Sequence, residues 1–309
     1  MDYTALTEAG PLLLGVDGGA TKCRARLCAA SGVTLAEAVA GPANIRFGME
    51  TSFAAVFEAG AQCLRQAGFS SRDLDRVVAC LALAGASEPA YRALAERYRH
   101  PYRHAVVTTD AHAACVGAHA GGDGAVIIVG TGSIGWAELR GQHVRIGGWG
   151  PVISDEGSGA WLGCEAARRV LWAYDGRIAW SELLTVLFAR FQSDPHAIVR
   201  WSSRAAPRDL AALAPLVVDF ATQGDRVAVE LMQTGAGYID TLAKQLVSLG
   251  GGRLALMGGL AENMQPWLAE ETRRHLVRPA GDALDGAIRL AATAAGLPPR
   301  EQPARSQRG

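Results

Sequence analysis

Two glycine-rich turns, each set between apolar segments, constrain the fold of this chain more than any other feature. The first turn, Asp17-Gly18-Gly19-Ala20 of the hexapeptide Asp17–Lys22, separates the strand patterns Leu12–Val16 and Lys22–Ala29. An Asp-Gly pair between apolar runs favours a β-hairpin. The second turn, Gly130-Thr131-Gly132-Ser133, also lies between two apolar segments. Because strand, glycine turn and strand occur twice, the sequence predicts a duplicated α/β domain.

Helical patterns fill much of the sequence around these hairpins. Thr51–Ala67 has apolar residues at helical spacing, and we expect Thr51 to cap that helix. Leu210–Ala221 and Ala283–Ala295 show the same periodicity. The polar, Pro- and Arg-rich segment after the last helix predicts a disordered tail.

Composition argues against several classes of partner. The 309 residues include 30 Lys or Arg and 30 Asp or Glu, so no net positive charge attracts nucleic acid or an anionic membrane. The longest apolar run, Val77–Ala86, is far shorter than the ~20 residues of a membrane span. The N-terminal segment has no basic residue before its apolar stretch, which is not typical of a signal peptide. We therefore expect a cytoplasmic protein with no nucleic-acid or membrane partner.

The cysteines indicate neither a zinc site nor a disulfide scaffold. They contain no C-x-x-C pair and lie at positions 23, 28, 63, 80, 115 and 164. Buried, reduced thiols are the simpler interpretation. The chain also lacks the G-x-x-x-x-G-K-[ST] sequence of a P-loop.

The first glycine turn can bind phosphate. Glycine lets backbone N–H groups approach a phosphate closely, and Thr21 and Lys22 add a hydroxyl and an ammonium donor. Asp17 can hold Mg²⁺ through water. An ordinary Asp-Gly hairpin turn is the alternative interpretation of this hexapeptide.

The second glycine turn, with Ile134 and Gly135, formally matches the dinucleotide-binding pattern G-x-G-x-x-G. That pattern must open a helix, whereas Arg140-Gly141-Gln142 here separates two alternating segments and indicates a hairpin. A second phosphate-binding hairpin is therefore the better hypothesis. Gly258-Gly259 follows the strand pattern Arg253–Met257 and predicts either a flat surface for a nucleobase or a tight strand-to-helix turn.

Asp110 follows the strand pattern Ala105–Thr109 and precedes a helix. It can be a helix N-cap, a general base facing a substrate hydroxyl, or both. The segment Gly147-Gly148-Trp149-Gly150-Pro151, followed by Ser154-Asp155-Glu156-Gly157-Ser158, combines an aromatic face with carboxylates. That combination is typical of a sugar pocket, although acidic residues before a helix also suit the helix dipole.

Together these motifs resemble the sugar kinase, hsc70 and actin superfamily, and within it the N-acetylglucosamine kinases of the BadF/BadG/BcrA/BcrD-type ATPase family. The resemblance extends from Leu12 to about Ala295. It implies an α/β fold of two ribonuclease-H-like (actin-like ATPase) domains around an ATP cleft. The implied domains are residues 1–118 plus 287–309, and residues 119–286.

The resemblance also implies roles for individual residues, carried over motif by motif. Contacts to ATP are implied for Gly18, Gly19, Thr21, Lys22, Gly130, Thr131, Gly132, Ser133, Gly258 and Gly259. Contacts to the sugar are implied for Asn44, Gly85, Asp110, Trp149, Gly150 and Asp155. Asp110 is the implied catalytic base, and Asp17 is the implied residue beside Mg²⁺.

The implied activity is ATP-dependent phosphorylation of N-acetylglucosamine at its 6-hydroxyl, with ATP and Mg²⁺ as cofactors and a small amino sugar as partner. A homodimer is compatible with the sequence. Ala84 and Asp17 depart from the animal enzymes, which have Ser and Glu there, so the acceptor is the least specified part of the prediction. Glucosamine or broader amino-sugar kinases, iron–sulfur ATPase activators of CoA-thioester dehydratases or reductases, and a non-catalytic sugar sensor remain alternatives.

Overall fold

The computed structural model describes residues 10–298, which form two compact units. Unit 1 contains residues 10–123 and 279–298, and unit 2 contains residues 124–278. The domain limits 118/119 and 286/287 expected from the sequence stay a prediction. The N-terminal segment and the tail from residue 299 lie outside the described residues. No helix within residues 10–298 is long and apolar enough to cross a membrane.

Unit 1 is built on a five-stranded sheet in which the first three strands are antiparallel and the last two run parallel to the first. The antiparallel part is the hairpin predicted around the first glycine turn, extended by a third strand. The strand order is β3-β2-β1-β4-β5. The strands are β1 (Leu12–Gly18), β2 (Cys23–Cys28), β3 (Thr34–Ala40), β4 (Val77–Leu83) and β5 (His104–Thr108).

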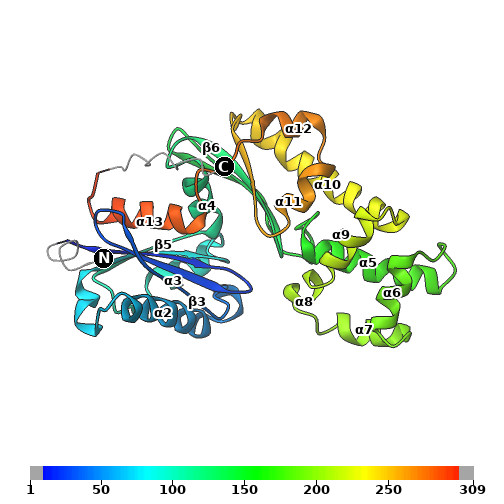
Figure 1. Cartoon of the computed structure of the whole chain (residues 1–309), viewed down its shortest axis with the longest axis horizontal. Coiled ribbons are helices and arrows are strands. Elements are labelled where there is room, and N and C mark those ends of the chain that lie inside the picture. Colours follow the sequence, from blue (N-terminus) through cyan, green and yellow to red (C-terminus); the bar gives the residue numbers. More distant parts are fainter. Residues whose placement is uncertain (1–9, 299–309) are drawn as a thin grey trace. The chain divides into compact units, whose positions relative to one another are not determined.

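Helices cover both faces of this sheet (Figure 1). α2 (Met49–Gln66) packs on one face through Phe53 and Val56. α4 (Asp110–Ala118) and α13 (Ala283–Ala294) lie on the other face, against a small core that includes Leu13 and Cys80. The remaining elements of unit 1 are η1 (Ile45–Phe47), η2 (Ser71–Arg76) and α3 (Pro89–Glu96).

The predicted start of helix α2 was wrong. The helix begins at Met49, with Gly48 rather than Thr51 at the N-cap position. Gly48 has a φ of +147°, a conformation that favours glycine and permits the chain to enter the helix three residues earlier than predicted. The helical periodicity of the segment was predicted correctly, but a Thr in the first turn is not by itself a cap.

The contact between α4 and α13 depends on two glycines. A Cβ on Gly286 of α13 would overlap the carbonyl oxygen of Ala113, and a Cβ on Gly117 of α4 would overlap that of Asp282. The two helix backbones therefore touch directly. Since α4 begins at Asp110, this contact fixes the helix that carries the predicted catalytic base.

Replacing Gly286 with alanine is expected to lower the free energy of unfolding by about 3 kcal/mol, the upper end of the usual range for overpacked interiors. The measurement is urea unfolding of the ligand-free protein. Gly237→Ala in unit 2 is the matched control, because a Cβ at Gly237 meets open space and alanine is the better helix former. Equal stability of the Gly286→Ala variant and the parent would contradict the close approach of α4 and α13.

Unit 2 repeats the same sheet plan with one strand fewer. Its order is β8-β7-β6-β9, with β6, β7 and β8 antiparallel and β9 parallel to β6. The strands are β6 (Gly124–Val129), β7 (Ser133–Leu139), β8 (Gln142–Gly147) and β9 (Leu254–Met257). The duplicated α/β plan predicted from the two glycine turns is therefore confirmed.

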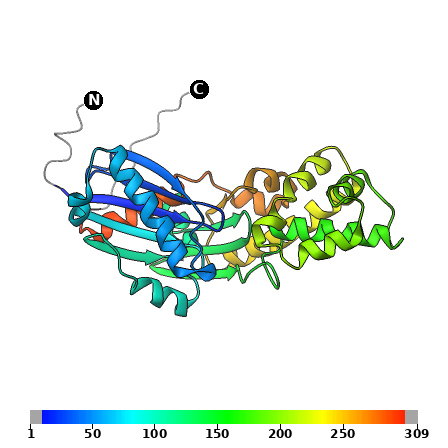
Figure 2. The same ribbon diagram turned by 90° about the horizontal axis from the view of Figure 1, so that it is seen from below.

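Helices make up the rest of unit 2, drawn from green to orange in Figure 2. They are α5 (Gly159–Tyr174), α6 (Glu182–Arg190), α7 (Pro195–Ser202), α8 (Pro207–Ala211), α9 (Ala214–Thr222), α10 (Arg226–Ser248), α11 (Ala261–Met264), η3 (Gln265–Trp267) and α12 (Glu270–His275). The single helix predicted over Leu210–Ala221 is wrong. Pro215 has no N–H to donate, so a helix tolerates it only in the first turn. A new helix, α9, therefore begins just before Pro215, and the predicted helix is divided between α8 and α9.

None of the six cysteines, which all lie within the described residues, forms a disulfide. Five are buried, and Cys164 is partly exposed. Burial raises the pKa of the Cys80 thiol to about 12, and burial together with the nearby Asp17 charge raises that of Cys23 to about 12. Both thiols are therefore neutral and weakly reactive at neutral pH.

Candidate active site

The parallel strands of unit 1 bring two carboxylates to the same edge of the sheet. Asp17 on β1 is in register with Ala82 on β4, which is in register with Thr108 on β5. Two strand spacings separate Asp17 from Thr108 by about 10 Å. Asp110 follows two residues later. The carboxyl edge of a parallel sheet is where α/β proteins bind ligands, which agrees with the prediction for both residues.

Asp17 and Asp110 also share one side of the sheet. Leu13 and Gly15, on the same face of β1 as Asp17, pack against α13. Ala82 belongs to the same small core, and α4 covers this face starting from Asp110. The two carboxylates therefore belong to one region of unit 1.

Asp110 is the first residue of α4 and not its N-cap, which corrects one of the two roles considered for it. The cap is Thr109, whose hydroxyl accepts a hydrogen bond from the His112 N–H at 2.9 Å. The Asp110 Oδ1 accepts one from the Ala111 N–H at 2.9 Å. The positive end of the helix dipole stabilises the ionised carboxylate here, and the ionised form is the one that can accept a proton.

The first glycine turn leaves its polar donors available. The Gly19 N–H donates to the carbonyl oxygen of Lys22 at 3.0 Å, which closes the turn. Thr21 and Lys22 are exposed, and within residues 10–298 the Thr21 hydroxyl and the Lys22 ammonium have no hydrogen-bond partner. The predicted phosphate donors are therefore on the surface and uncommitted.

Asn44 and Gly85, predicted to contact the sugar, lie against one another. A Cβ on Gly85 would come 2.9 Å from Oδ1 of Asn44, and Gly85 has a φ of +92°. Oδ1 of Asn44 accepts a hydrogen bond from the Arg46 N–H at 3.0 Å. The amide N–H₂ of Asn44 is then the group that remains to donate to a ligand.

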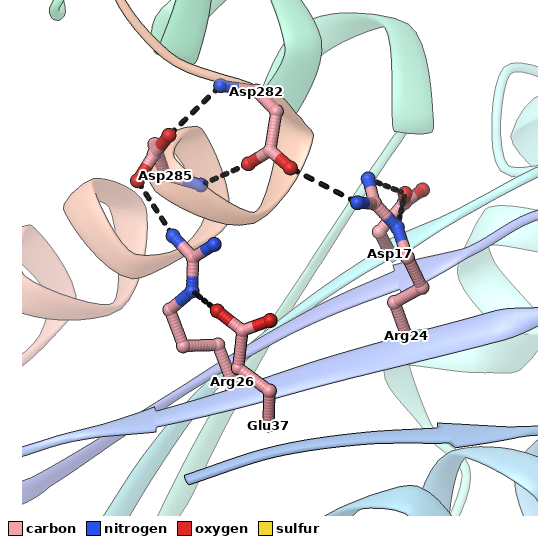
Figure 3. A network of polar contacts seen from close by, with 6 residues as sticks. All are labelled: Asp17, Arg24, Arg26, Glu37, Asp282 and Asp285. Atoms are coloured by element: carbon pink, nitrogen blue, oxygen red, sulfur yellow. Dashed lines mark hydrogen bonds and ion pairs between the residues drawn. The ribbon is translucent and has the colours of Figure 1, made fainter. Parts of the chain in front are cut away.

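Sequence reasoning missed the partner of Asp17. Arg24 on β2 donates to Oδ2 of Asp17 from Nε at 3.1 Å and from Nη2 at 2.7 Å (Figure 3). In the part of the chain that the structure describes, no three His, Cys, Asp or Glu side chains form a set that could hold a metal alone. Mg²⁺ needs only one or two carboxylates beside waters and substrate phosphates, so Asp17 fits the expected role.

The second glycine turn connects two antiparallel strands of unit 2. The Gly130 N–H donates to the carbonyl oxygen of Gly132 at 2.9 Å, and β7 follows at once. This arrangement confirms the hairpin and excludes a dinucleotide-binding turn, which has to open a helix. Gly132 is not among the glycines with positive φ, so its backbone conformation does not itself require glycine.

The turn is tied to the start of α5. The Gly159 N–H donates to the carbonyl oxygen of Gly130 at 2.8 Å, and that of Ala160 to Thr131 at 3.1 Å. The Ser133 hydroxyl donates to the carbonyl oxygen of Glu156 at 2.8 Å. The Ser133 hydroxyl proton is thus used in the hydrogen bond to Glu156, and the Thr131 hydroxyl is the better phosphate donor.

Asp155 organises both functional loops of unit 2. Its Oδ1 accepts a hydrogen bond from the Gly150 N–H at 3.1 Å, and its Oδ2 lies 2.6 Å from where a Cβ of Gly132 would be. The side chain is only 8% exposed, and its φ of +60° is uncommon for a residue other than glycine. A buried carboxylate in a strained backbone is typical of a functional site.

Trp149 is presented on the surface of unit 2. Its side chain is 62% exposed, and the Arg145 guanidinium lies 3.9 Å from the centre of the ring. Arg145 is itself held by the carbonyl oxygens of Gly147 and Gly148, each at 3.0 Å. This rigid support leaves much of the indole exposed, as a sugar-binding aromatic requires.

The glycine pair after β9 lies beside the second turn, since the Gly259 N–H is 3.9 Å from where a Cβ of Gly130 would be. Gly258 has a φ of +99°, and a Cβ there would overlap the Val129 carbonyl. The backbone at this position therefore requires glycine. Gly259 faces open space. This arrangement suits a flat nucleobase surface at Gly259 more than at Gly258.

The structure thus gathers the predicted residues into two groups. Unit 1 holds the group at the carboxyl edge of its sheet, namely Asp17, Gly18, Gly19, Thr21, Lys22, Asn44, Gly85 and Asp110. Unit 2 holds the group around Asp155, namely Gly130, Thr131, Gly132, Ser133, Trp149, Gly150, Asp155, Gly258 and Gly259. Paired sheets of this plan, each with a glycine hairpin after its first strand, define the two-domain fold of actin-like ATPases.

Comparison with known proteins identifies the family. The model of the BadF/BadG/BcrA/BcrD ATPase family matches residues 14–291, and the chain belongs to that family. This result confirms the resemblance seen in the motifs.

Individual relatives agree with this assignment. A glucosamine kinase of Vibrio cholerae is 38% identical over 279 residues, which cover 90% of this chain and 95% of that enzyme. A solved structure from Chromobacterium violaceum, assigned as an N-acetylglucosamine kinase, is 34% identical with a TM-score of 0.86 and covers 92% and 99% of the two chains. An N-acetylmuramic acid/N-acetylglucosamine kinase of Clostridium acetobutylicum is 26% identical over 85% of this chain and 90% of its own. The expected fold and the expected class of enzyme, an ATP-dependent kinase, are confirmed.

Proposed function

We propose that this protein transfers the γ-phosphoryl group of ATP to the 6-hydroxyl of an amino sugar. The observation that carries the proposal is the placement of Asp110 at the carboxyl edge of the unit 1 sheet, after β5, which pairs with the strand that Gly85 of the predicted sugar site follows. Asp110 accepts the proton of the attacking hydroxyl. Asn44 donates to the sugar, and Trp149 supplies an aromatic face.

Bound Mg·ATP supplies the phosphoryl group, and Mg²⁺ offsets the negative charge on its oxygens. Asp17 would hold that ion through water, while the first turn would bind phosphate through the side chains of Thr21 and Lys22 and through backbone N–H groups other than that of Gly19. The second turn contributes the Thr131 hydroxyl and the Gly132 N–H. Catalysis by these residues is mainly positioning and charge stabilisation.

Between the possible acceptors we favour glucosamine. The support is the 38% identity with a glucosamine kinase over nearly its whole length. Ala84, which offers a methyl group next to Gly85, provides no hydroxyl for recognition of an acetamido group. N-acetylglucosamine, the acceptor that the sequence motifs favoured, is the second candidate, supported by the assignment of the Chromobacterium violaceum structure.

We expect kcat/KM for glucosamine to exceed that for N-acetylglucosamine by roughly tenfold or more, because a site without a hydroxyl to pair with the acetamido group leaves polar atoms of that group unpaired. The measurement is sugar-dependent ADP release at fixed Mg²⁺ and ATP, with N-acetylmannosamine, N-acetylmuramate and glucose in the same panel. 6-Deoxyglucosamine is the matched control and should release no ADP above background.

A preference for N-acetylglucosamine would move the assignment to the second candidate and leave the kinase proposal intact. ADP release with no sugar in the panel would overturn the proposed function itself. The colour and iron content of the purified protein test the iron–sulfur activator alternative separately.

A further inference from the structure

Two arginines on β2 make parallel connections between the sheet of unit 1 and helix α13 (Figure 3). Arg24 joins Asp17 on β1 to Asp282, with Nη1 3.0 Å from Oδ2 of Asp282. Arg26 joins Glu37 on β3 to Asp285, at 2.6 Å to each carboxylate. The two arginines are two residues apart, so they lie on the same face of the strand.

The two aspartates of α13 are themselves joined in a capping box. The Asp285 N–H donates to Oδ1 of Asp282 at 3.1 Å, and the Asp282 N–H donates to Oδ2 of Asp285 at 2.9 Å. Each of these carboxylates therefore uses one oxygen for the cap and the other for an arginine. Both oxygens are committed in Asp282 and in Asp285.

Asp17 differs from them in one respect. Its Oδ2 receives both hydrogen bonds from Arg24, while its Oδ1 accepts none from residues 10–298. The side chain is 19% exposed and lies immediately before the Gly18-Gly19 turn. Arg24 thus fixes the carboxylate through Oδ2. Oδ1 remains available to accept a hydrogen bond from a water molecule bound to a metal ion.

We propose that Arg24 is a positioning residue that orients Asp17 toward Mg²⁺ bound with the nucleotide phosphates, and that Asp282 in turn orients Arg24. The inference rests on the proposed function for the identity of the ligand. Arg24 also holds the planar fork geometry that a lysine cannot reproduce, because two of its nitrogens reach the same carboxylate oxygen. The bond to Asp282 restricts the third nitrogen, and so fixes the guanidinium plane.

A purely structural role is the competing explanation, and Arg26 distinguishes the two. Arg26 has the same charge, the same strand and the same partner helix, but its sheet partner is Glu37. If the arginines serve only to join β2 to α13, Arg24→Lys and Arg26→Lys should have the same consequences. If Arg24 orients Asp17, the two variants should differ in metal binding alone.

The test measures binding of Mn²⁺ in the presence of ADP by electron paramagnetic resonance, together with ADP affinity without metal by calorimetry. Arg24→Lys should weaken Mn²⁺ binding by about tenfold, the lower end of the range for residues that orient a metal ligand. Arg26→Lys should leave Mn²⁺ binding unchanged. Both variants should keep the metal-free affinity for ADP, and thermal unfolding should show similar losses of stability.

A double-mutant cycle with Asp17→Asn completes the test, since a residue that acts through Asp17 has no further effect once that carboxylate is gone. Equal effects of Arg24→Lys and Arg26→Lys on Mn²⁺ binding, or additive effects of Arg24→Lys and Asp17→Asn, would overturn the inference. Failure of the parent protein to bind ADP with Mn²⁺ would instead overturn the proposed function. A parent that binds both and phosphorylates a sugar, with normal Mn²⁺ binding by Arg24→Lys, would overturn the inference alone.

Discussion

Replacing Asp110 with asparagine is expected to lower kcat by about 10²–10⁴-fold, the usual contribution of a positioned general base. Asparagine has nearly the same shape but cannot accept the proton of the sugar hydroxyl. Its Oδ1 can still accept the hydrogen bond from the Ala111 N–H, and the cap at Thr109 is untouched. Affinity for ATP and stability should therefore change little.

The measurements are steady-state kinetics with glucosamine, calorimetry with ADP, and thermal unfolding. Asp75→Asn is the matched control, because Asp75 is an exposed carboxylate in η2, immediately before β4 begins and therefore at the opposite edge of the same sheet. It should behave as the parent does. Turnover by the Asp110→Asn variant within a few-fold of the parent would remove Asp110 from the role of base.

Replacing Gly132 with valine is expected to weaken ADP binding by roughly 100-fold or more. Loss of two charge-assisted hydrogen bonds, each worth about 1.5–3 kcal/mol, is sufficient for that change. The Cβ of valine would come 2.6 Å from Oδ2 of Asp155, so either this carboxylate or the turn that is proposed to bind phosphate has to shift. The measurement is calorimetry with ADP and Mg²⁺.

Gly252→Val is the control, since Gly252 lies in the same unit, faces open space and has no positive φ. The double variant Gly132→Val with Asp155→Ala separates two causes of the loss. If the valine acts by blocking the phosphate, removal of the Asp155 carboxylate will not restore binding. Restored binding would instead assign the loss to displacement of Asp155, and unchanged binding in Gly132→Val would remove the second turn from the nucleotide site.

The principal predicted strands and most of the longer helices occur in the structure, because hydrophobic periodicity and glycine turns are local properties of the backbone. The hairpin at Gly130 could be distinguished from a dinucleotide-binding turn by the alternating residues that follow it. The errors were also local: Thr51 was taken for a cap, and Pro215 was not recognised as a helix break. In both cases a neighbouring residue, a glycine or a proline, determined where the helix begins.

The sequence did not reveal what holds the site residues in place. Arg24 and Asp282 are 258 positions apart, and their contact depends on α13 packing over β1 and β2. The contacts of Asp155 with Gly150 and Gly132 likewise depend on how the loop after β8 folds back on the Gly130 turn. Paired charges at such separations leave no pattern in a single sequence.

By itself, the sequence determined which backbone segments could approach a phosphate and which carboxylate would stand at a strand end, since turn chemistry and periodicity act over a few residues. Only the tertiary structure decided that Asp17 is held by one oxygen and that the Ser133 hydroxyl donates to the Glu156 carbonyl oxygen. These are choices among competing hydrogen-bond partners. A polar group can form a hydrogen bond only with partners that packing has brought within about 3 Å of it.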